Sequence, residues 1–261
     1  MQNDQITEIK EKVMKLVKFI KKRKHERVKK ERLLEQQRIL KDIFLGNTTV
    51  INGPFKGMSY IPDSHGSMLL PKIAGSYEEP IQHWIEDVIH NKDYKNLIDI
   101  GCAEGYYACG FALKMPNTNI WAFDISEEAQ KLTLELAQKN ALTNVSVGGV
   151  CSRDRLNELC QGGTLVFCDI EGGEKDLLLP EYIPNLKKVD IIIESHDCII
   201  PNVTEELISR FKDSHNITMI IDYPNRVKSY QFPVEPNDSE LKLIFDERRS
   251  KYMRFLYLTV K

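Results

Sequence analysis

Hydrophobic and polar positions divide the chain into a helical arm and an alternating body. Residues 6–44 contain no proline or glycine, and apolar residues recur at three- and four-residue spacing from Ile9 to Ile20. This spacing predicts one long amphipathic helix. A run rich in lysine and arginine over residues 21–30 interrupts the apolar stripe, so a regular coiled coil is not expected. We expect residues 1–45 to form a basic helical arm.

The next segment, residues 46–75, is rich in glycine, proline, serine and asparagine. This composition predicts turns and short strands that connect the arm to a domain over residues 76–261. Residues 77–90 then show apolar positions at helical spacing, which predicts a helix packed on a sheet.

From residue 96 onward, short apolar runs alternate with amphipathic segments. We predict strands over 97–100, 120–125, 145–150, 165–170, 189–194, 217–221 and 255–260, and helices over 106–115, 127–141, 177–186 and 205–211. The alternation indicates parallel βαβ winding, and therefore an α/β fold with a Rossmann-like, doubly wound sheet of seven strands. A polar stretch over 225–252 separates the last two strands and is too long to be structureless throughout.

Composition agrees with one large α/β domain plus an appendage. The chain has 261 residues, 42% of them hydrophobic, and a formal net charge of −2 that conceals the basic arm. The six cysteines show no metal-ligand spacing and are expected to be reduced thiols of the core. The N-terminal residues show no continuous apolar stretch followed by a small-residue cleavage site, and the sequence has no run of about 20 apolar residues that could cross a bilayer. We expect a cytoplasmic protein, with the arm able to meet the inner face of the membrane.

The turn after the first strand of this alternation carries informative chemistry. It places Asp99, Gly101, Ala103 and Gly105 at alternate positions before a helix. Glycines let a ligand approach the backbone, and a helix N-terminus offers N–H groups to an anion. The spacing differs from the dinucleotide pattern G-x-G-x-x-G. Asp124 follows the next strand, where a carboxylate can accept hydrogen bonds from ribose hydroxyls. The turn therefore predicts a nucleoside site; alternatively, both acids only cap backbone N–H groups.

This turn and Asp124 resemble those of class I S-adenosylmethionine-dependent methyltransferases, over about residues 76–261. The run Asp169-Ile170-Glu171-Gly172-Gly173-Glu174 resembles the D-x-E-G-x-E run of FkbM-type methyltransferases, which methylate oxygen atoms, often of sugars. Residues 53–58 and 75–78 also look like segments that precede the core in some FkbM-type proteins. The resemblance implies S-adenosylmethionine as cofactor and a sugar or glycan hydroxyl as acceptor, in surface polysaccharide biosynthesis.

The resemblance also implies which residues contact the cofactor. Gly101 and Glu104 would lie against its methionine part, Asp124 against the ribose, and Cys151 or Ser152 near the adenine. The full set expected at the cofactor is Asp99, Gly101, Ala103, Glu104, Gly105, Tyr106, Asp124, Ile125, Cys151, Ser152 and Asp169.

Acidic residues and a histidine follow two predicted strands. Asp169 and Glu171 are two residues apart, as are Glu194 and His196, so each pair would point the same way from an extended chain. Neighbouring strands could bring the pairs together at the carboxyl edge of the sheet. Asp169, Glu194 and His196 are therefore the candidate catalytic residues. With Glu171 they could hold Mg²⁺ or another divalent cation, or His196 could act alone as a general base.

Several functions stay open at this point. Arg248 and Arg249 could form a fork for a phosphorylated or nucleotide-linked acceptor, although a solvated loop is the simpler interpretation. An RNA methyltransferase would use the basic arm to grip phosphates, but the arm has little aromatic content for base stacking, so nucleic acid is not the expected partner. A noncatalytic scaffold is a third alternative. The arm is expected to mediate homo-oligomer formation or contact with a membrane surface.

Overall fold

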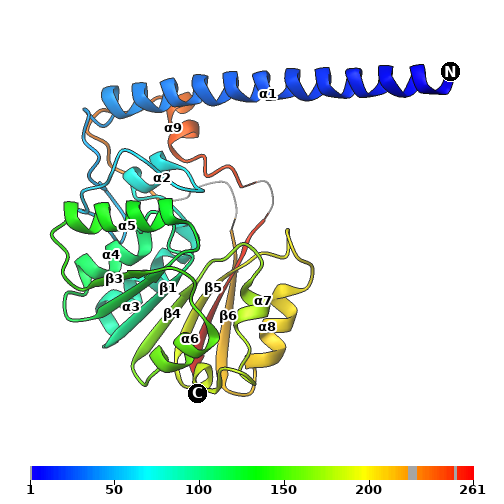
Figure 1. The fold of residues 1–261 in the computed structure, drawn as a ribbon. Coiled ribbons are helices and arrows are strands. Elements are labelled where there is room, and N and C mark those ends of the chain that lie inside the picture. The colour runs from blue at the N-terminus through cyan, green and yellow to red at the C-terminus, as the bar shows by residue number, and fades with distance from the viewer. Residues whose placement is uncertain (1, 223–227, 250–251) are drawn as a thin grey trace. The chain divides into compact units, whose positions relative to one another are not determined.

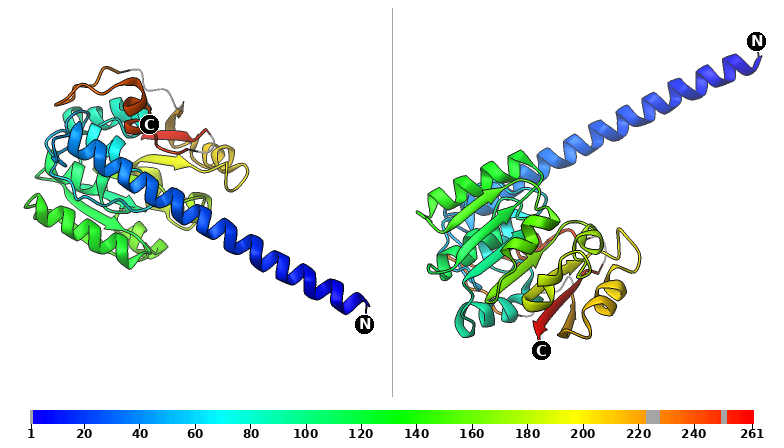
Figure 2. Two further views of the ribbon diagram at one scale, coloured as in Figure 1. Left: turned by 90° about the horizontal axis from the view of Figure 1, so that it is seen from above. Right: turned by 60° about the horizontal axis from the view of Figure 1, so that its bottom comes forward.

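The computed structural model describes residues 2–222, 228–249 and 252–261, and it divides into two compact units, Met1–Asn47 and Thr48–Lys261. The first unit is the helix α1 (Gln2–Asp42), followed by turns. α1 runs without a break (Figures 1 and 2), which confirms the predicted long helix. Among the described residues, no helix combines the length and the apolar character needed to cross a membrane.

The second unit is built on the predicted seven-stranded sheet. Its strands are β1 (Asn96–Ile100), β2 (Asn119–Phe123), β3 (Val145–Gly148), β4 (Thr164–Cys168), β5 (Asp190–Ser195), β6 (His215–Ile221) and β7 (Arg254–Val260). They lie in the order β3-β2-β1-β4-β5-β7-β6, with β1 to β5 parallel. β7 inserts antiparallel between β5 and β6, as the red strand in Figure 1 shows.

The order of the strands reverses between β1 and β4, so consecutive crossovers run outward in opposite directions. Right-handed crossovers then place α4 (Tyr106–Lys114) and α5 (Glu127–Lys139) on one face, and α7 (Glu174–Leu177) and α8 (Val203–Phe211) on the other. The yellow and green helices of Figure 2 lie on different sides of the sheet accordingly. Such a reversal opens a crevice at the carboxyl ends of the strands.

The central strands are buried because helices cover both faces of the sheet. Every residue of β4 is buried, as is every residue of β1 and β5 except the first. The short apolar runs that predicted these strands thus lie in the middle of the core, as expected for parallel strands. The cysteines are all free thiols, and each is buried except the half-buried Cys198.

The segment before β1 contains more helix than its composition predicts. An isolated bridge joins Thr49 to Ser59, but α2 (Leu69–Ala74) stands where only turns and short strands were expected. α2 is buried and ends at Gly75 in the left-handed conformation. A 3₁₀ turn (Glu79–Ile81) and α3 (Gln82–Asn91) follow. Most of the predicted connecting segment therefore belongs to the compact second unit.

Two further helical regions differ from the prediction, and one expectation is confirmed. α6 (Arg153–Leu159) was not expected, and the predicted helix over 177–186 is wrong. α7 ends at Leu177 and a 3₁₀ turn (Pro184–Lys188) follows, because two prolines interrupt any longer helix. The polar stretch over 225–252 holds α9 (Asp238–Ile244), begun by a capping box at its N-terminus.

Candidate functional site

A cavity of about 1030 Å³ opens in the second unit at the carboxyl ends of β1, β2, β4 and β5. Its wall includes most of the residues proposed from sequence: Asp99, Gly101, Ala103, Tyr106, Asp124, Ile125, Cys151, Asp169, Glu171, Glu194 and His196. Other parts of the wall come from the segments before β1 and before β7. The topology therefore assembles the predicted nucleoside site and the predicted acid cluster in one cavity.

The turn after β1 is shaped for close approach of backbone to backbone. Gly101 has a φ of +88°, and a Cβ at this position would overlap the carbonyl oxygen of Asp169. Gly105 has a φ of +92° and begins α4, with the side chain of Thr133 against it. Glycine is required at both positions because a side chain would clash and would strain the backbone.

Asp124 connects this turn to the end of β2. Its Oδ2 accepts a hydrogen bond from the Ala103 amide at 2.9 Å, and its Oδ1 accepts one from the Ser126 amide at 2.8 Å. The side chain is half-buried and lines the cavity beside Ile125 and Cys151. We call this part of the wall, formed by Asp124, Ile125 and Cys151, the nucleoside end.

Asp99, on β1, is a buried acid with an unsatisfied oxygen. Its side chain lines the cavity, and its Oδ2 has no hydrogen-bond partner among the described residues. Burial, with the negative charges of Asp124 and Glu78, raises the pKa of Asp99 to about 7. An unpaired buried carboxylate oxygen is costly unless a donor or cation meets it, so this wall fits a ligand with a positively charged group.

Three residues predicted at the cofactor lie outside the cavity wall: Glu104, Gly105 and Ser152. The Glu104 carboxylate is fully buried and accepts hydrogen bonds from the Tyr60 hydroxyl at 2.8 Å and the Ser64 hydroxyl at 2.9 Å, and it pairs with Lys72. Contacts within the protein therefore occupy the Glu104 carboxylate. Ser152 caps α6 by accepting a hydrogen bond from the Arg155 amide, which explains its position away from the cavity.

The acid cluster converges on His196. The imidazole Nε2 lies 3.5 Å from Asp169 Oδ1 and 3.5 Å from Glu171 Oε2, while Nδ1 lies 2.8 Å from Glu174 Oε1. Glu171 has a φ of +55°, so the chain does not continue extended after β4 as predicted. A turn rather than a strand brings Glu171 toward the imidazole.

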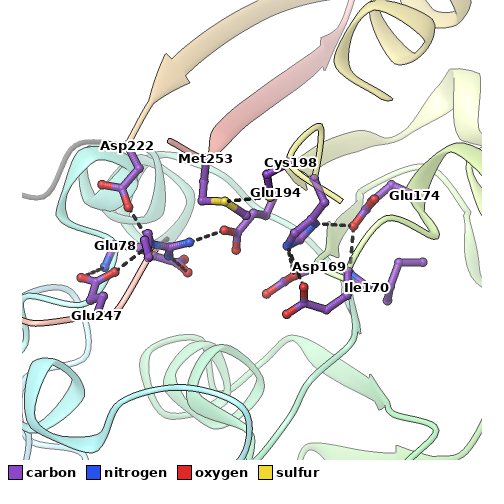
Figure 3. A network of polar contacts seen from close by, with 12 residues as sticks. Glu78, Asp169, Ile170, Glu174, Glu194, Cys198, Asp222, Glu247 and Met253 are labelled. Atoms are coloured by element: carbon purple, nitrogen blue, oxygen red, sulfur yellow. Dashed lines mark hydrogen bonds and ion pairs between the residues drawn. The ribbon is translucent and has the colours of Figure 1, made fainter. Parts of the chain in front are cut away.

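Glu194, the remaining predicted member, pairs with Arg249 instead. In Figure 3 the labelled side chains of Glu78, Asp222 and Glu247 lie on the same side of the network as Glu194. The guanidinium also pairs with Glu78 at 2.6 Å, Asp222 at 2.6 Å and Glu247 at 3.1 Å. The predicted arginine fork is therefore closed by the protein's own carboxylates. The simpler expectation of a solvated loop is also wrong at this position, because the Arg249 side chain is only 18% exposed.

Burial and crowding of like charges shift the pKa values of this wall. Burial raises the pKa of Asp169 well above its usual value, and the charges of Glu194 and Glu78 act in the same direction. Burial also raises the pKa of Glu194 to about 7, although Arg249 opposes the shift. For His196, burial lowers the pKa, but the hydrogen bond to Glu174 and nearby carboxylates outweigh it, so the pKa is raised.

Sequence reasoning missed several residues of this site. Lys72 and Tyr77 line the cavity, but the sequence assigned no role to either, and Arg249 was considered only as part of a fork for the acceptor. Glu174 stood within the D-x-E-G-x-E run, so its position was visible, but its pairing with His196 was not.

The chain is similar in sequence to known methyltransferases. The sequence profile described as "Methyltransferase domain" matches residues 91–231, more than half of the chain. A release factor glutamine methyltransferase from Chlorobaculum tepidum is 28% identical over 132 residues, which are 50% of this chain and 42% of that protein. The chain thus spans less than half the length of this relative.

Solved structures with a similar arrangement include a precorrin-6Y C5,15-methyltransferase from Geobacter metallireducens, with a TM-score of 0.45, 13% identity, and coverage of 65% of this chain and 82% of that one. An rRNA methylase from Streptococcus thermophilus also has a TM-score of 0.45 and 13% identity, with coverage of 70% of this chain and 97% of that one. The profile match, together with the strand order and the turn after β1, shows that the chain belongs to the methyltransferase domain family and has the class I fold of S-adenosylmethionine-dependent methyltransferases.

Proposed function

We propose that this methyltransferase transfers the methyl group of S-adenosylmethionine to a hydroxyl oxygen of a sugar-type acceptor. The observation that carries the proposal is the contact between Glu174 and Nδ1 of His196, a residue of the cavity wall, which leaves Nε2 facing Asp169 and Glu171. A hydroxyl must lose its proton as its oxygen attacks a methyl group, and an oriented imidazole is a suitable base.

The cavity fits the cofactor at both ends. Asp124 would accept hydrogen bonds from the ribose, Cys151 would border the adenine, and Asp99 would meet the α-amino group with its unpaired oxygen. The cofactor supplies an electrophilic methyl group on a sulfonium. The protein's part is to align the acceptor, exclude water and remove the proton.

The hydrogen bonds around His196 prepare its imidazole to accept the proton of the acceptor hydroxyl. Glu174 Oε1 accepts from the amides of Ile170 and Gly172, each at 3.1 Å, so the carboxylate is fixed and its acceptor oxygen faces Nδ1. Nδ1 then carries the hydrogen, and Nε2, which lies 3.5 Å from Asp169 Oδ1 and from Glu171 Oε2, takes the proton of an acceptor hydroxyl. Glu174 stabilises the imidazolium that results.

The charge of the wall favours a neutral acceptor with several hydroxyls. Carboxylate oxygens of Asp169, Glu171 and Glu194 can accept hydrogen bonds from hydroxyl groups. Every described cation in the wall already faces a carboxylate: His65, Lys72, His196, Arg248 and Arg249. A phosphorylated acceptor or an RNA backbone would therefore have to compete with these carboxylates for the cations of the wall. The FkbM-type run after β4 supports a glycan acceptor in surface polysaccharide biosynthesis.

A divalent cation is the alternative to a free imidazole base. Asp169, Glu171 and His196 offer ligand atoms within 4.8 Å of one another. Glu194, the fourth predicted ligand, is outside this group because Arg249 holds it. Mg²⁺ prefers oxygen ligands, and two carboxylates with one imidazole are a poor set for it. The arrangement supports the metal-free mechanism.

Transfer of a labelled methyl group tests the proposal directly. The acceptors tested are neutral sugars and glycans, sugar phosphates, RNA and a glutamine-containing peptide. The peptide is included because the similar protein from Chlorobaculum tepidum is named a release factor glutamine methyltransferase. We expect label on a neutral glycan, and a loss of about 10² to 10⁴ in turnover for His196→Ala with cofactor affinity retained. Label on RNA or peptide alone would refute the acceptor class, and binding without any transfer would indicate the scaffold alternative.

A further inference from the structure

A lysine from outside the sheet forms part of the cofactor cavity. Lys72 lies on α2 and its side chain is only 3% exposed, yet it borders the cavity together with Ser67 and Tyr77. A lysine is seldom buried unless it is paired, because its ammonium loses the solvation of water.

Glu104 is the partner that makes this burial possible. Lys72 Nζ hydrogen-bonds to Glu104 Oε1 and donates to Ser67 Oγ at 2.6 Å, and it lies 4.9 Å from the centre of the Tyr77 ring. Glu104 and Ser67 account for two of the three N–H donors of an ammonium. Glu104 itself accepts further hydrogen bonds from Tyr60, Ser64 and the His65 amide. The carboxylate is saturated, whereas the ammonium is not.

Asp99 provides the opposite charge in the same wall. Asp99 also lines the cavity, its Oδ2 is buried with no hydrogen-bond partner among the described residues, and the charge of Lys72 favours its ionised form. One anionic oxygen and one ammonium with a spare donor complement the two ends of an α-amino acid. The nucleoside end lies elsewhere in this cavity, at the end of β2.

We infer that Lys72 binds the methionine carboxylate of S-adenosylmethionine, and that Glu104 is a positioning residue that acts through Lys72. The inference rests on the proposed cofactor binding. It moves the contact with the methionine part from Glu104 to a residue of α2 that lies 24 positions before the first residue of β1.

Decarboxylated S-adenosylmethionine tests this inference because it keeps the nucleoside, sulfonium and amine and lacks only the carboxylate. Calorimetry compares its affinity with that of S-adenosylmethionine for the wild-type protein and for K72M/E104Q. The double variant removes both charges, so no unpaired carboxylate is left buried. Lys56→Met, at an exposed lysine outside the cavity wall, is the matched control.

We expect the wild-type protein and the control to bind S-adenosylmethionine about 10- to 100-fold more tightly than the decarboxylated form, as a charge-assisted hydrogen bond provides. K72M/E104Q should lose this preference while its affinity for the decarboxylated form stays within about threefold. An unchanged preference in the double variant, or an equal loss for both ligands, would show that Lys72 only supports the fold. Failure of the wild-type protein to bind either ligand would instead refute the proposed function.

Discussion

The Nδ1 atom of His196 lies 2.8 Å from the Oε1 atom of Glu174, which is completely buried. The same oxygen accepts hydrogen bonds from two backbone amides of the turn after β4, so the carboxylate cannot turn away. The first residue of α7 therefore orients the imidazole that follows β5. This pairing connects the D-x-E-G-x-E run to the chemistry of the cavity.

Replacing Glu174 with glutamine should change how activity depends on pH. The Glu174 contact raises the pKa of His196 against the effect of burial, and the unprotonated imidazole is the active base. Loss of the negative charge lowers this pKa, so the acidic limb of the kcat profile should move to lower pH. Turnover at the optimum should fall by about tenfold or more, because orientation of the imidazole weakens. Kinetics from pH 5 to 9 would measure both effects.

The matched control for this variant is Glu181→Gln, at an exposed glutamate. Its profile should overlay that of the wild-type protein. If Glu174→Gln kept the acidic limb in place, the limb would belong to another group and His196 would not be the base.

Asp99 should make cofactor binding depend on pH near neutrality. Its pKa of about 7 means that it is largely protonated in the free protein below neutral pH, whereas an ammonium favours the ionised form. Affinity for S-adenosylhomocysteine should therefore rise as pH increases through about 7. This product lacks the sulfonium charge, which reduces any influence of His196. Calorimetry at about pH 6 and 7.5 would detect the rise, since both values lie below the usual pKa of an α-amino group.

Asp99→Asn should bind S-adenosylhomocysteine more weakly and with little change over this range of pH. Methylthioadenosine, which lacks the α-amino group, should show a flat response with the wild-type protein. A pH response that survived in Asp99→Asn would assign the titration to a different group.

The sequence contained enough information for the sheet and the nucleoside end. The apolar runs of β1, β4 and β5 are buried on both faces, so they are recognisable without tertiary information. Asp124 could be placed at the cavity because its distance from the glycine turn is set by one helix and one strand. Local regularity made both predictions possible.

Prediction failed where a contact joins irregular segments. Arg249 meets Glu78 across 171 positions, and neither residue belongs to a periodic element. Glu104 looked like a ligand residue from its place in the turn, but α2, which was not predicted, supplies the lysine that occupies it. The positions of such side chains depend on long-range packing rather than on local spacing.

Arg249 should be important for stability, because four carboxylates surround its guanidinium. Arg249→Met would leave Glu78, Glu194, Asp222 and Glu247 without their shared cation. Removal of one partner from a buried ionic group costs about 3–5 kcal/mol. We expect a loss of this order in the free energy of unfolding at pH 8, measured with a denaturant. The loss should be smaller at pH 5, where protonation relieves the repulsion among the carboxylates.

Arg155→Met offers a comparison at an arginine that pairs on the surface with Glu158 at 2.7 Å. This change should cost less than about 1 kcal/mol at either pH. A loss for Arg249→Met as small as that of the surface pair would mean that water already stabilises the carboxylates.

Chelation should leave methyl transfer unaffected if His196 acts as a free base. Glu174 already holds Nδ1, and Nε2 must stay unbound to receive a proton. Turnover measured after dialysis against EDTA should match that of the untreated enzyme, and added Mg²⁺ should not increase it. Loss of turnover on chelation and its return with metal would assign Asp169, Glu171 and His196 to a cation site.

Removal of residues 1–46 should leave cofactor binding intact and abolish attachment to a membrane surface. Every residue that lines the cavity belongs to the unit Thr48–Lys261, so the truncated protein should keep its affinity for S-adenosylhomocysteine within about twofold. α1 carries exposed cations such as Lys22 and exposed apolar side chains such as Phe19, which is 55% exposed. A helix of this kind can lie on an anionic membrane surface.

We expect the full chain to sediment with vesicles that contain anionic lipid, and to do so less at high salt, because screening weakens contacts between lysines and headgroups. The truncated protein should stay in the supernatant under both conditions. Light scattering of both proteins, without lipid, tests self-association: a larger assembly that disappears on truncation, with no binding to vesicles, would assign the helix to oligomer formation. A folded truncated protein that no longer bound S-adenosylhomocysteine would contradict the separation of the two roles, because residues of the arm would then contribute to the cofactor site.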